Sequence, residues 1–198
     1  MGLDFDFSEG QTPLDDEEKD GLLIQGITTH GELNEFEQQN IEDAMYWVMT
    51  KNFKMKDIFT ESFVCEVHKR MFGNVWAWAG EYRKSNKNLG ANHWQIPVLL
   101  KTLLDDALYW IANETYGMDE IAVRLKHRIV SIHCFSNGNG RHSRLLADII
   151  IEKGYKQNVF SWGAANLSNQ TDVRKKYLKA VKAADKHNYH LLLEFARS

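Results

Sequence analysis

Apolar side chains recur at helical spacing along most of the chain, and this pattern predicts the fold class. The clearest case precedes His133, where four aliphatic residues fall on one helical face: Ile121, Leu125, Ile129 and Ile132. Turn and capping residues set the ends of the periodic stretches. The pattern predicts helices over residues 33–52, 60–72, 98–112, 118–133, 141–153, 172–186 and 189–197. We therefore expect a mainly α fold, a bundle of about eight helices.

One stretch, residues 84–96, does not follow the helical pattern. It has low helix propensity, contains Asn88, Gly90 and Asn92, and ends just before Pro97. These residues predict a small β-hairpin attached to the helical bundle.

The first 20 residues differ in composition from the rest of the chain. They carry eight acidic side chains and one lysine, and a glycine and a proline interrupt any periodicity. We expect a flexible acidic arm there and a single domain over residues 21–198, because a domain of that size buries enough surface for its own core. A second interpretation stays open, in which Leu3, Phe5 and Phe7 add a strand to a partner.

Composition and charge narrow the classes of function. Apolar residues make up 43% and charged residues 26% of the chain, which is ordinary for a globular protein. The formal net charge of -3 gives no basic surplus for a nucleic-acid partner. The two cysteines, Cys65 and Cys134, lack metal-ligand spacing, and the chain shows no membrane-spanning or signal-peptide pattern. We expect a soluble cytoplasmic protein whose partners include neither nucleic acid nor membrane.

The chemistry of the chain is concentrated in residues 133–144, which read His-Cys-Phe-Ser-Asn-Gly-Asn-Gly-Arg-His-Ser-Arg. The Gly-Asn-Gly run tolerates positive φ, so the backbone can curl and direct several N–H groups toward one point. The following helix carries Arg141 and Arg144 in its first turns, where the helix dipole disfavours cations. An anion would offset this positive charge, and guanidinium groups suit phosphate. The stretch therefore predicts a polyphosphate site.

His133 stands at the rim of this predicted cradle. Its ordinary pKa of ~6.5 leaves neutral imidazole available near pH 7, so it can accept a proton from an incoming hydroxyl. A zinc site with His127 and His142 is an alternative interpretation. Spacings of six and nine on helices that flank a loop do not converge on one point, and no acidic residue or cysteine completes a tetrahedral set. His133 is thus the candidate general base.

Residues 133–144 resemble the signature of the Fic (Fic/Doc) family, His-x-Phe-x-(Asp/Glu/Asn)-Gly-Asn-Gly-Arg-x-x-Arg, and every fixed position is filled. Residues 78–83, Trp-Ala-Gly-Glu-Tyr-Arg, resemble the Trp-Ala-Gly-x-x-Arg turn of the family, and the segment after them resembles its β-hairpin flap. The resemblance covers about residues 30–195 and implies a Fic-type helical fold.

The resemblance implies a protein adenylyltransferase, which transfers AMP from ATP to a Ser, Thr or Tyr hydroxyl of a target protein. It implies His133 as the catalytic residue and Asn137 as the Mg²⁺ ligand, at a position where the family commonly has a carboxylate. The implied nucleotide-binding residues are Gly138, Asn139, Gly140, Arg141, Arg144 and Tyr177. The implied target-docking residues of the flap are Asn88, Leu89 and Gly90.

The resemblance also implies a form of restraint. In several family toxins a glutamate of the motif (Ser/Thr)-x-x-x-Glu-(Gly/Asn) pairs with the second motif arginine, which is Arg144 here. The nearest match runs from Thr28 to Glu32, but Leu33 follows it, and a helix cap explains Glu32 equally well. Inhibition would come either from Glu32 or from a separate antitoxin-like protein of a toxin–antitoxin pair.

Two further functions remain open at this point. The Doc branch of the family phosphorylates its target, and its loop reads Ala-Asn-Lys-Arg where residues 138–141 of this chain read Gly-Asn-Gly-Arg. The glycine form favours nucleotide transfer over phosphotransfer. The remaining possibility is a catalytically silent module that binds a nucleotide or a partner.

Overall fold

The structure is a computed structural model that describes residues 14–164 and 170–198. Residues 1–13 of the predicted arm therefore lie outside the described residues, and so does the possible docking strip at its start. Within the described ranges no helix is both long and apolar enough to cross a membrane.

All regular elements of the described chain are helices, which confirms the predicted mainly α fold. The helices are α1 (Asp16–Lys19), α2 (His30–Thr50), α3 (Met55–Ile58), α4 (Glu61–Phe72), α5 (Ile96–Ala112), α6 (Met118–Ile132), α7 (Asn139–Ile149), α8 (Gln170–Ala184) and α9 (His190–Arg197). A 3-10 turn, η1 (His93–Gln95), leads into α5, and a π-helical turn, η2 (Ile150–Gly154), extends α7. The two helices of four residues, α1 and α3, are those that the hydrophobic pattern did not predict.

Local sequence explains where the long helices begin. Thr29 caps α2 by accepting a hydrogen bond from the Glu32 backbone N–H at 3.2 Å, and the Glu32 carboxylate accepts one from the Thr29 N–H at 3.0 Å. Thr60 caps α4 by accepting a hydrogen bond from the Phe63 N–H at 3.2 Å. Such caps satisfy donors that have no partner inside the helix.

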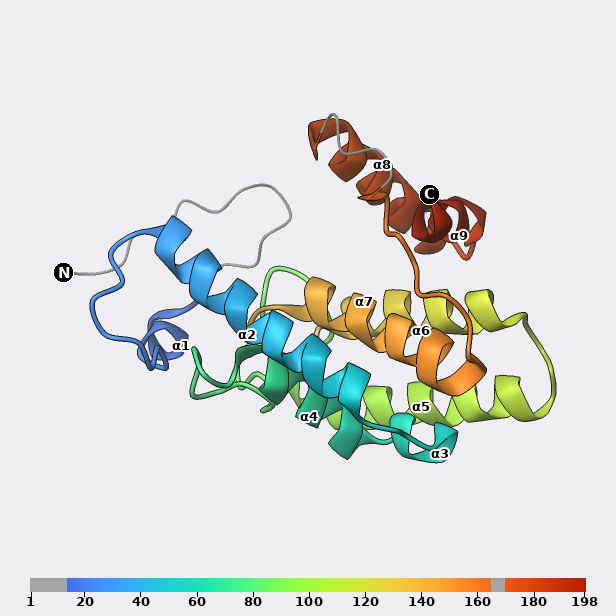
Figure 1. The fold of residues 1–198 in the computed structure, drawn as a ribbon, viewed down its shortest axis with the longest axis horizontal. Helices are drawn as coiled ribbons and strands as arrows, with labels where there is room; N and C mark the ends of the chain where they lie inside the picture. Colours follow the sequence, from blue (N-terminus) through green and yellow to red (C-terminus); the bar gives the residue numbers. More distant parts are fainter. Residues whose placement is uncertain (1–13, 165–169) are drawn as a thin grey trace.

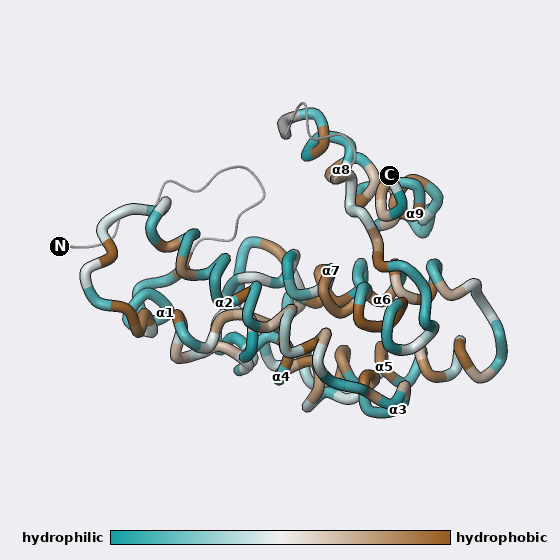
Figure 2. Tube along the Cα trace, viewed as in Figure 1, coloured by the Kyte–Doolittle hydropathy of each residue, from teal (hydrophilic) through white to brown (hydrophobic). Residues whose placement is uncertain are grey.

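Helix α6 lies at the centre of the bundle and packs against α5, α7 and α9. Figure 1 shows α5, α6 and α7 side by side, with α2 crossing the bundle and packing on α4. Figure 2 shows that hydrophobic residues gather where α5, α6 and α7 meet, whereas α2 is largely hydrophilic. The core therefore forms around the two helices that flank residues 133–138.

The buried face of α2 is partly polar. Phe36 and Met45 of the same helix are 47% and 48% exposed. The buried side chains of α2 are Leu33, Glu37, Asn40, Ala44 and Val48. Two polar residues thus lie on the inner face, because each has hydrogen-bond partners there: Trp76 donates to Glu37, and Asn40 bonds the backbone of Arg70 and Asn74.

The C-terminal hairpin of α8 and α9 lies at one side of the bundle in Figure 1 and contacts α6 through α9 and through Tyr177 of α8. A polar contact at the end of α8 adds to this packing. The His127 Nε2 of α6 donates to the Asp185 carboxylate at 2.8 Å, and the Tyr189 hydroxyl lies 3.3 Å from His127 Nδ1. Burial lowers the pKa of His127, so the imidazole is neutral at pH 7 and can bridge the two partners.

The predicted β-hairpin over residues 84–96 is not present, and this prediction was wrong. That segment is irregular before η1, and the described residues hold one isolated backbone bridge, between Leu22 and Trp76. Side chains take the place of cross-strand hydrogen bonds. Arg83 donates to the backbone oxygens of Ser85 and Ala91, and the Asn86 side chain accepts from the His93 N–H.

Helix α1 packs on this irregular segment through ion pairs. Lys87, whose side chain is 7% exposed, pairs with Glu18 and lies 3.2 Å from the Asp15 carboxylate. The Ser85 hydroxyl donates to the same Asp15 at 2.8 Å. Hydrogen bonds from Glu18, Ser85 and Lys87 outweigh burial and lower the pKa of Asp15. The last residues of the predicted acidic arm are therefore part of the fold.

We predict that Lys87→Ala destabilises the protein by about 1–3 kcal/mol, because it leaves the mostly buried Glu18 carboxylate without its cation. Urea unfolding at pH 7 measures this change. Lys84→Ala is the matched control, since Lys84 is 87% exposed in its ion pair and should change stability by less than ~0.5 kcal/mol. Equal stability of both variants would contradict a structural role for the α1 contact.

Candidate active site

The loop between α6 and α7 turns at Gly138, the N-terminal cap of α7. Gly138 has φ 76°, and a Cβ there would lie 2.5 Å from the Phe72 ring, so both conformation and space require glycine. Helix α7 has no side-chain cap and no acidic residue in its first turn. Its first N–H groups and the positive end of its dipole are thus available to an anion, as the sequence predicts.

Two buried side chains hold this loop in shape. The Asn139 side chain accepts from the Phe135 N–H at 3.0 Å and donates to the Phe135 oxygen at 2.7 Å. His68 Nε2 donates to the Asn137 oxygen at 3.0 Å, while its Nδ1 accepts from the Gly80 N–H at 3.0 Å. Burial holds the pKa of His68 well below its ordinary value, which keeps the neutral form that this arrangement requires. Asn139, predicted to bind phosphate, therefore acts on the loop itself.

His133 ends α6 in the left-handed conformation, with φ 59°. Its backbone oxygen accepts a hydrogen bond from Arg83 Nε at 2.6 Å. Gly90 packs so closely that a Cβ there would lie 2.5 Å from the His133 Cβ. Burial first, and then the charges of Arg83 and Lys87, lower the pKa of His133 to about 4. The imidazole is consequently neutral at pH 7, as a general base requires.

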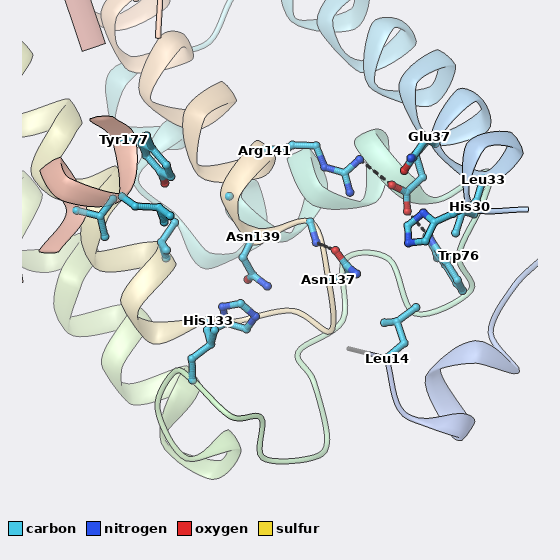
Figure 3. A pocket seen from close by; sticks show the side chains of 17 residues that line it. Leu14, His30, Leu33, Glu37, Trp76, His133, Asn137, Asn139, Arg141 and Tyr177 are labelled. Atoms are coloured by element: carbon cyan, nitrogen blue, oxygen red, sulfur yellow. Dashed lines mark hydrogen bonds and ion pairs between the residues drawn. The ribbon is translucent and has the colours of Figure 1, made fainter. Parts of the chain in front are cut away.

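A cavity of about 480 Å³ joins these elements (Figure 3). It is lined by Leu14, His30, Leu33, Asn34, Glu37, Trp76, Leu89, Val130, His133, Asn137, Gly138, Asn139, Gly140, Arg141, Tyr177, Leu178 and Val181. Figure 3 places Tyr177 at one end and Glu37 with Trp76 at the other, with His133, Asn137 and Asn139 between them. The structure thus brings together most residues that the resemblance implied.

Arg141 lies at the α2 end of the cavity, where it meets a carboxylate that sequence reasoning missed. Its Nη1 lies 2.6 Å from Glu37 Oε2, and the other Glu37 oxygen accepts from Trp76 Nε1 at 2.7 Å. The Arg141 guanidinium also lies over the Phe72 ring, 4.9 Å from its centroid. A signal for Glu37 exists in the sequence, because it falls on the same helical face as Leu33.

Arg144 does not line the cavity but lies behind Tyr177. Its guanidinium carbon is 4.7 Å from the Tyr177 ring centroid and 5.8 Å from that of Trp162. Lys126 of α6, which sequence reasoning also missed, donates to the Tyr177 hydroxyl at 2.6 Å. Arg141 and Arg144 therefore lie at opposite ends of the site.

The residues around Asn137 offer little to a metal ion on their own. The Asn137 side-chain oxygen accepts from the Gly138 N–H at 2.5 Å. The described residues contain no group of three or more His, Cys, Asp or Glu side chains that could hold a metal. A divalent cation at Asn137 would thus take most of its ligands from a bound phosphate chain.

Two of the predicted flap residues lie at or next to the cavity, whereas the predicted inhibitory residue lies at the start of α2. Leu89 lines the cavity and Gly90 contacts His133, whereas Asn88 is exposed. Glu32 is exposed at the start of α2, where its carboxylate accepts hydrogen bonds from both Thr28 and Thr29. The structure supports the helix cap for Glu32, and no contact within the described residues supports pairing with Arg144.

Comparisons with known proteins identify similar sequences. The model of the Fic/DOC family matches residues 58–151. A protein adenylyltransferase Fic from Aedes aegypti is 26% identical over 148 residues, which is 68% of this chain and 29% of the relative. The adenylyltransferase fic-1 of Caenorhabditis briggsae is 33% identical over 92 residues, 44% of this chain and 18% of the relative. The chain therefore spans less than a third of the length of these curated relatives.

Solved structures share the fold. The BepC protein of Bartonella tribocorum, with bound AMPPNP, superposes with a TM-score of 0.67 at 15% identity, over 92% of this chain and 97% of that one. Fic-1 of C. elegans gives 0.63 at 18% identity, over 90% of this chain and 51% of that one. The match over residues 58–151 and the helical fold around residues 133–144 thus support the resemblance of this chain to the Fic/DOC family.

Proposed function

We propose that the protein is an adenylyltransferase, which transfers AMP from ATP to a hydroxyl side chain of another protein. One observation carries the proposal: a neutral His133 imidazole and the uncapped start of α7 face the same cavity of about 480 Å³. Relatives that carry the name protein adenylyltransferase support it, as does a BepC structure that holds AMPPNP.

The site residues suit the steps of such a transfer. The start of α7 and Arg141 hold the phosphate chain, and Arg144 adds positive charge from behind Tyr177. The target hydroxyl oxygen attacks the α-phosphorus, His133 accepts the hydroxyl proton, and pyrophosphate leaves. AMP remains bound to the target oxygen.

Mg²⁺ would be held by the Asn137 oxygen together with phosphate oxygens of the nucleotide, where it would neutralise phosphate charge. The neutral amide is a weaker partner for this cation than a carboxylate. The target would dock beside Leu89 and Gly90, the flap residues nearest His133. Because Glu32 caps α2, restraint of the activity is assigned to a separate antitoxin-like partner.

Transfer can be tested with ATP labelled on the α-phosphate and, separately, on the γ-phosphate. Incubation with a lysate as target source should place the α-label on protein. Label from the γ-phosphate alone would support the Doc-like phosphotransferase, and label from neither would support a silent binding module. Either of these outcomes overturns the proposal.

We predict that His133→Ala abolishes labelling from α-labelled ATP and leaves ATP affinity within about twofold, because the imidazole acts on the hydroxyl and not on the phosphates. Isothermal titration gives the affinity and gel autoradiography gives the labelling. His190→Ala, at an exposed histidine of α9, is the control and should label as wild type does. Labelling that survives in His133→Ala would exclude His133 as the base.

We predict that the transfer rate stays flat as pH falls from 8 to 5 and declines only near pH 4. The pKa of His133 is lowered to about 4, so the imidazole remains deprotonated and able to accept a proton throughout that range. An unperturbed histidine would lose activity near pH 6.5. A rate that halves near pH 6.5 in single-turnover experiments would show that the residue is not desolvated as described.

We predict that Asn137→Asp lowers the Mg²⁺ concentration needed for half-maximal transfer by about tenfold, because it adds a charged oxygen ligand. Titration of Mg²⁺ at fixed ATP measures the change. Asn34→Asp, which also adds a carboxylate to the cavity wall, controls for charge alone. The same Mg²⁺ requirement in Asn137→Asp and wild type would place the ion away from residue 137.

A further inference from the structure

Helix α6 buries a lysine behind the nucleotide end of the cavity. Lys126 is 0% exposed, and its ammonium donates to the Tyr177 hydroxyl at 2.6 Å. No carboxylate of residues 14–164 or 170–198 forms an ion pair with it. Burial of an ammonium is costly, and burial lowers the pKa of Lys126. Because the Lys126 ammonium is buried without a carboxylate and donates to a residue that lines the cavity, we expect it to act in the site.

A second cation flanks the same tyrosine. The Arg144 guanidinium carbon lies 4.7 Å from the Tyr177 ring centroid, and the Lys126 Nζ lies 4.5 Å from it. Burial alone would raise the pKa of the Tyr177 phenol, but Lys126 and Arg144 outweigh it and lower the pKa. The two cations therefore make the phenol a stronger hydrogen-bond donor than an ordinary tyrosine.

Donor geometry decides where the phenol hydrogen can point. Ammonium and guanidinium groups have donors and no acceptor, so neither Lys126 nor Arg144 can accept the Tyr177 hydrogen. The phenol oxygen accepts from Lys126, and its own hydrogen is left to point into the cavity that Tyr177 lines. Lys126 thereby fixes the direction of the hydroxyl.

The surroundings of Tyr177 indicate which part of a nucleotide it would meet. Leu178, Val181 and Val130 line the cavity with apolar side chains, whereas the start of α7 supplies the N–H groups for phosphate. Figure 3 shows the ring of Tyr177 at the end of the cavity opposite Glu37. An apolar end beyond a phosphate cradle suits a nucleoside.

We propose that Lys126 is a positioning residue, which holds the Tyr177 hydroxyl as a hydrogen-bond donor to an acceptor atom of the nucleoside. The acceptor is a ring nitrogen of the base or an oxygen of the ribose. The inference rests on the proposed nucleotide-dependent function. It gives this chain a determinant of nucleotide affinity outside residues 133–144.

The test measures ATP binding by isothermal titration in the full chain, with transfer kinetics alongside. Tyr177→Phe and Lys126→Met should each raise the Kd of ATP about tenfold, since each removes the directed donor. The double variant should show about the same loss as Tyr177→Phe alone, because both changes remove one interaction. At saturating ATP the transfer rate should remain within about twofold of wild type, so KM rises and kcat does not.

Lys175→Met is the matched control, because Lys175 is an exposed lysine on the same helix as Tyr177. It should bind ATP as wild type does. Thermal unfolding of each variant separates loss of fold from loss of affinity. If Lys126→Met does not fold, Tyr177→Phe and the analogue series below still decide the question.

Nucleotide analogues identify the acceptor. Wild type and Tyr177→Phe are compared with 3-deaza-ATP, 7-deaza-ATP and 2′-deoxy-ATP. The analogue that lacks the acceptor should bind both proteins equally, while the others keep the tenfold difference.

The outcomes separate this inference from the proposed function. If wild type binds ATP and Tyr177→Phe binds it equally well, the positioning role of Lys126 is overturned and the adenylyltransferase proposal stands. Losses that add up in the double variant would also overturn it, since independent sites are then involved. If wild type does not bind ATP, both proposals fail together.

Discussion

The site depends on one buried guanidinium, that of Arg83. The end of α6 leaves backbone oxygens without helical partners, and Arg83 donates to those of His133 and Ile132. The same group donates to Ser85 and Ala91 at the two ends of an irregular segment. One planar group with five donors therefore fixes both the catalytic candidate and the segment that packs on it. The Ala91 N–H adds a direct backbone hydrogen bond to the Ile132 oxygen at 3.1 Å.

Close packing also restrains the His133 side chain. Gly90 lies against the His133 Cβ, where no larger residue fits without movement. On the other side of the loop, His68 and Asn139 hold the backbone from Phe135 to Asn137 through buried hydrogen bonds. Side chains from different helices thus hydrogen-bond the loop backbone and fix its shape. The shape of the loop in turn sets the direction of the first N–H groups of α7.

Charge is distributed unevenly along the cavity. At the α2 end, Glu37 balances Arg141 in a pair shielded by Trp76. At the α8 end, Lys126 and Arg144 share the phenol of Tyr177 instead of a carboxylate. An anionic ligand therefore meets a compensated arginine at one end and less compensated positive charge at the other. In the proposed binding mode the N–H groups at the start of α7 hold the phosphates, and the nucleoside meets the positive charge at the other end only through the Tyr177 hydroxyl.

The sequence by itself determined the helical fold, most helix ends and the loop at residues 133–144, because helical periodicity, capping residues and glycine conformations are local properties. It also supplied His133 as the candidate base and the resemblance to the Fic family. It did not determine that residues 84–96 avoid a hairpin, since the Arg83 guanidinium bonds backbone oxygens of this segment only while it is held at the distant end of α6. Nor did it reveal Glu37 and Lys126, whose roles require partners 39 and 51 positions away along the chain, Trp76 and Tyr177. Tertiary structure decided these points, because a buried charge is tolerated only where packing brings it a partner.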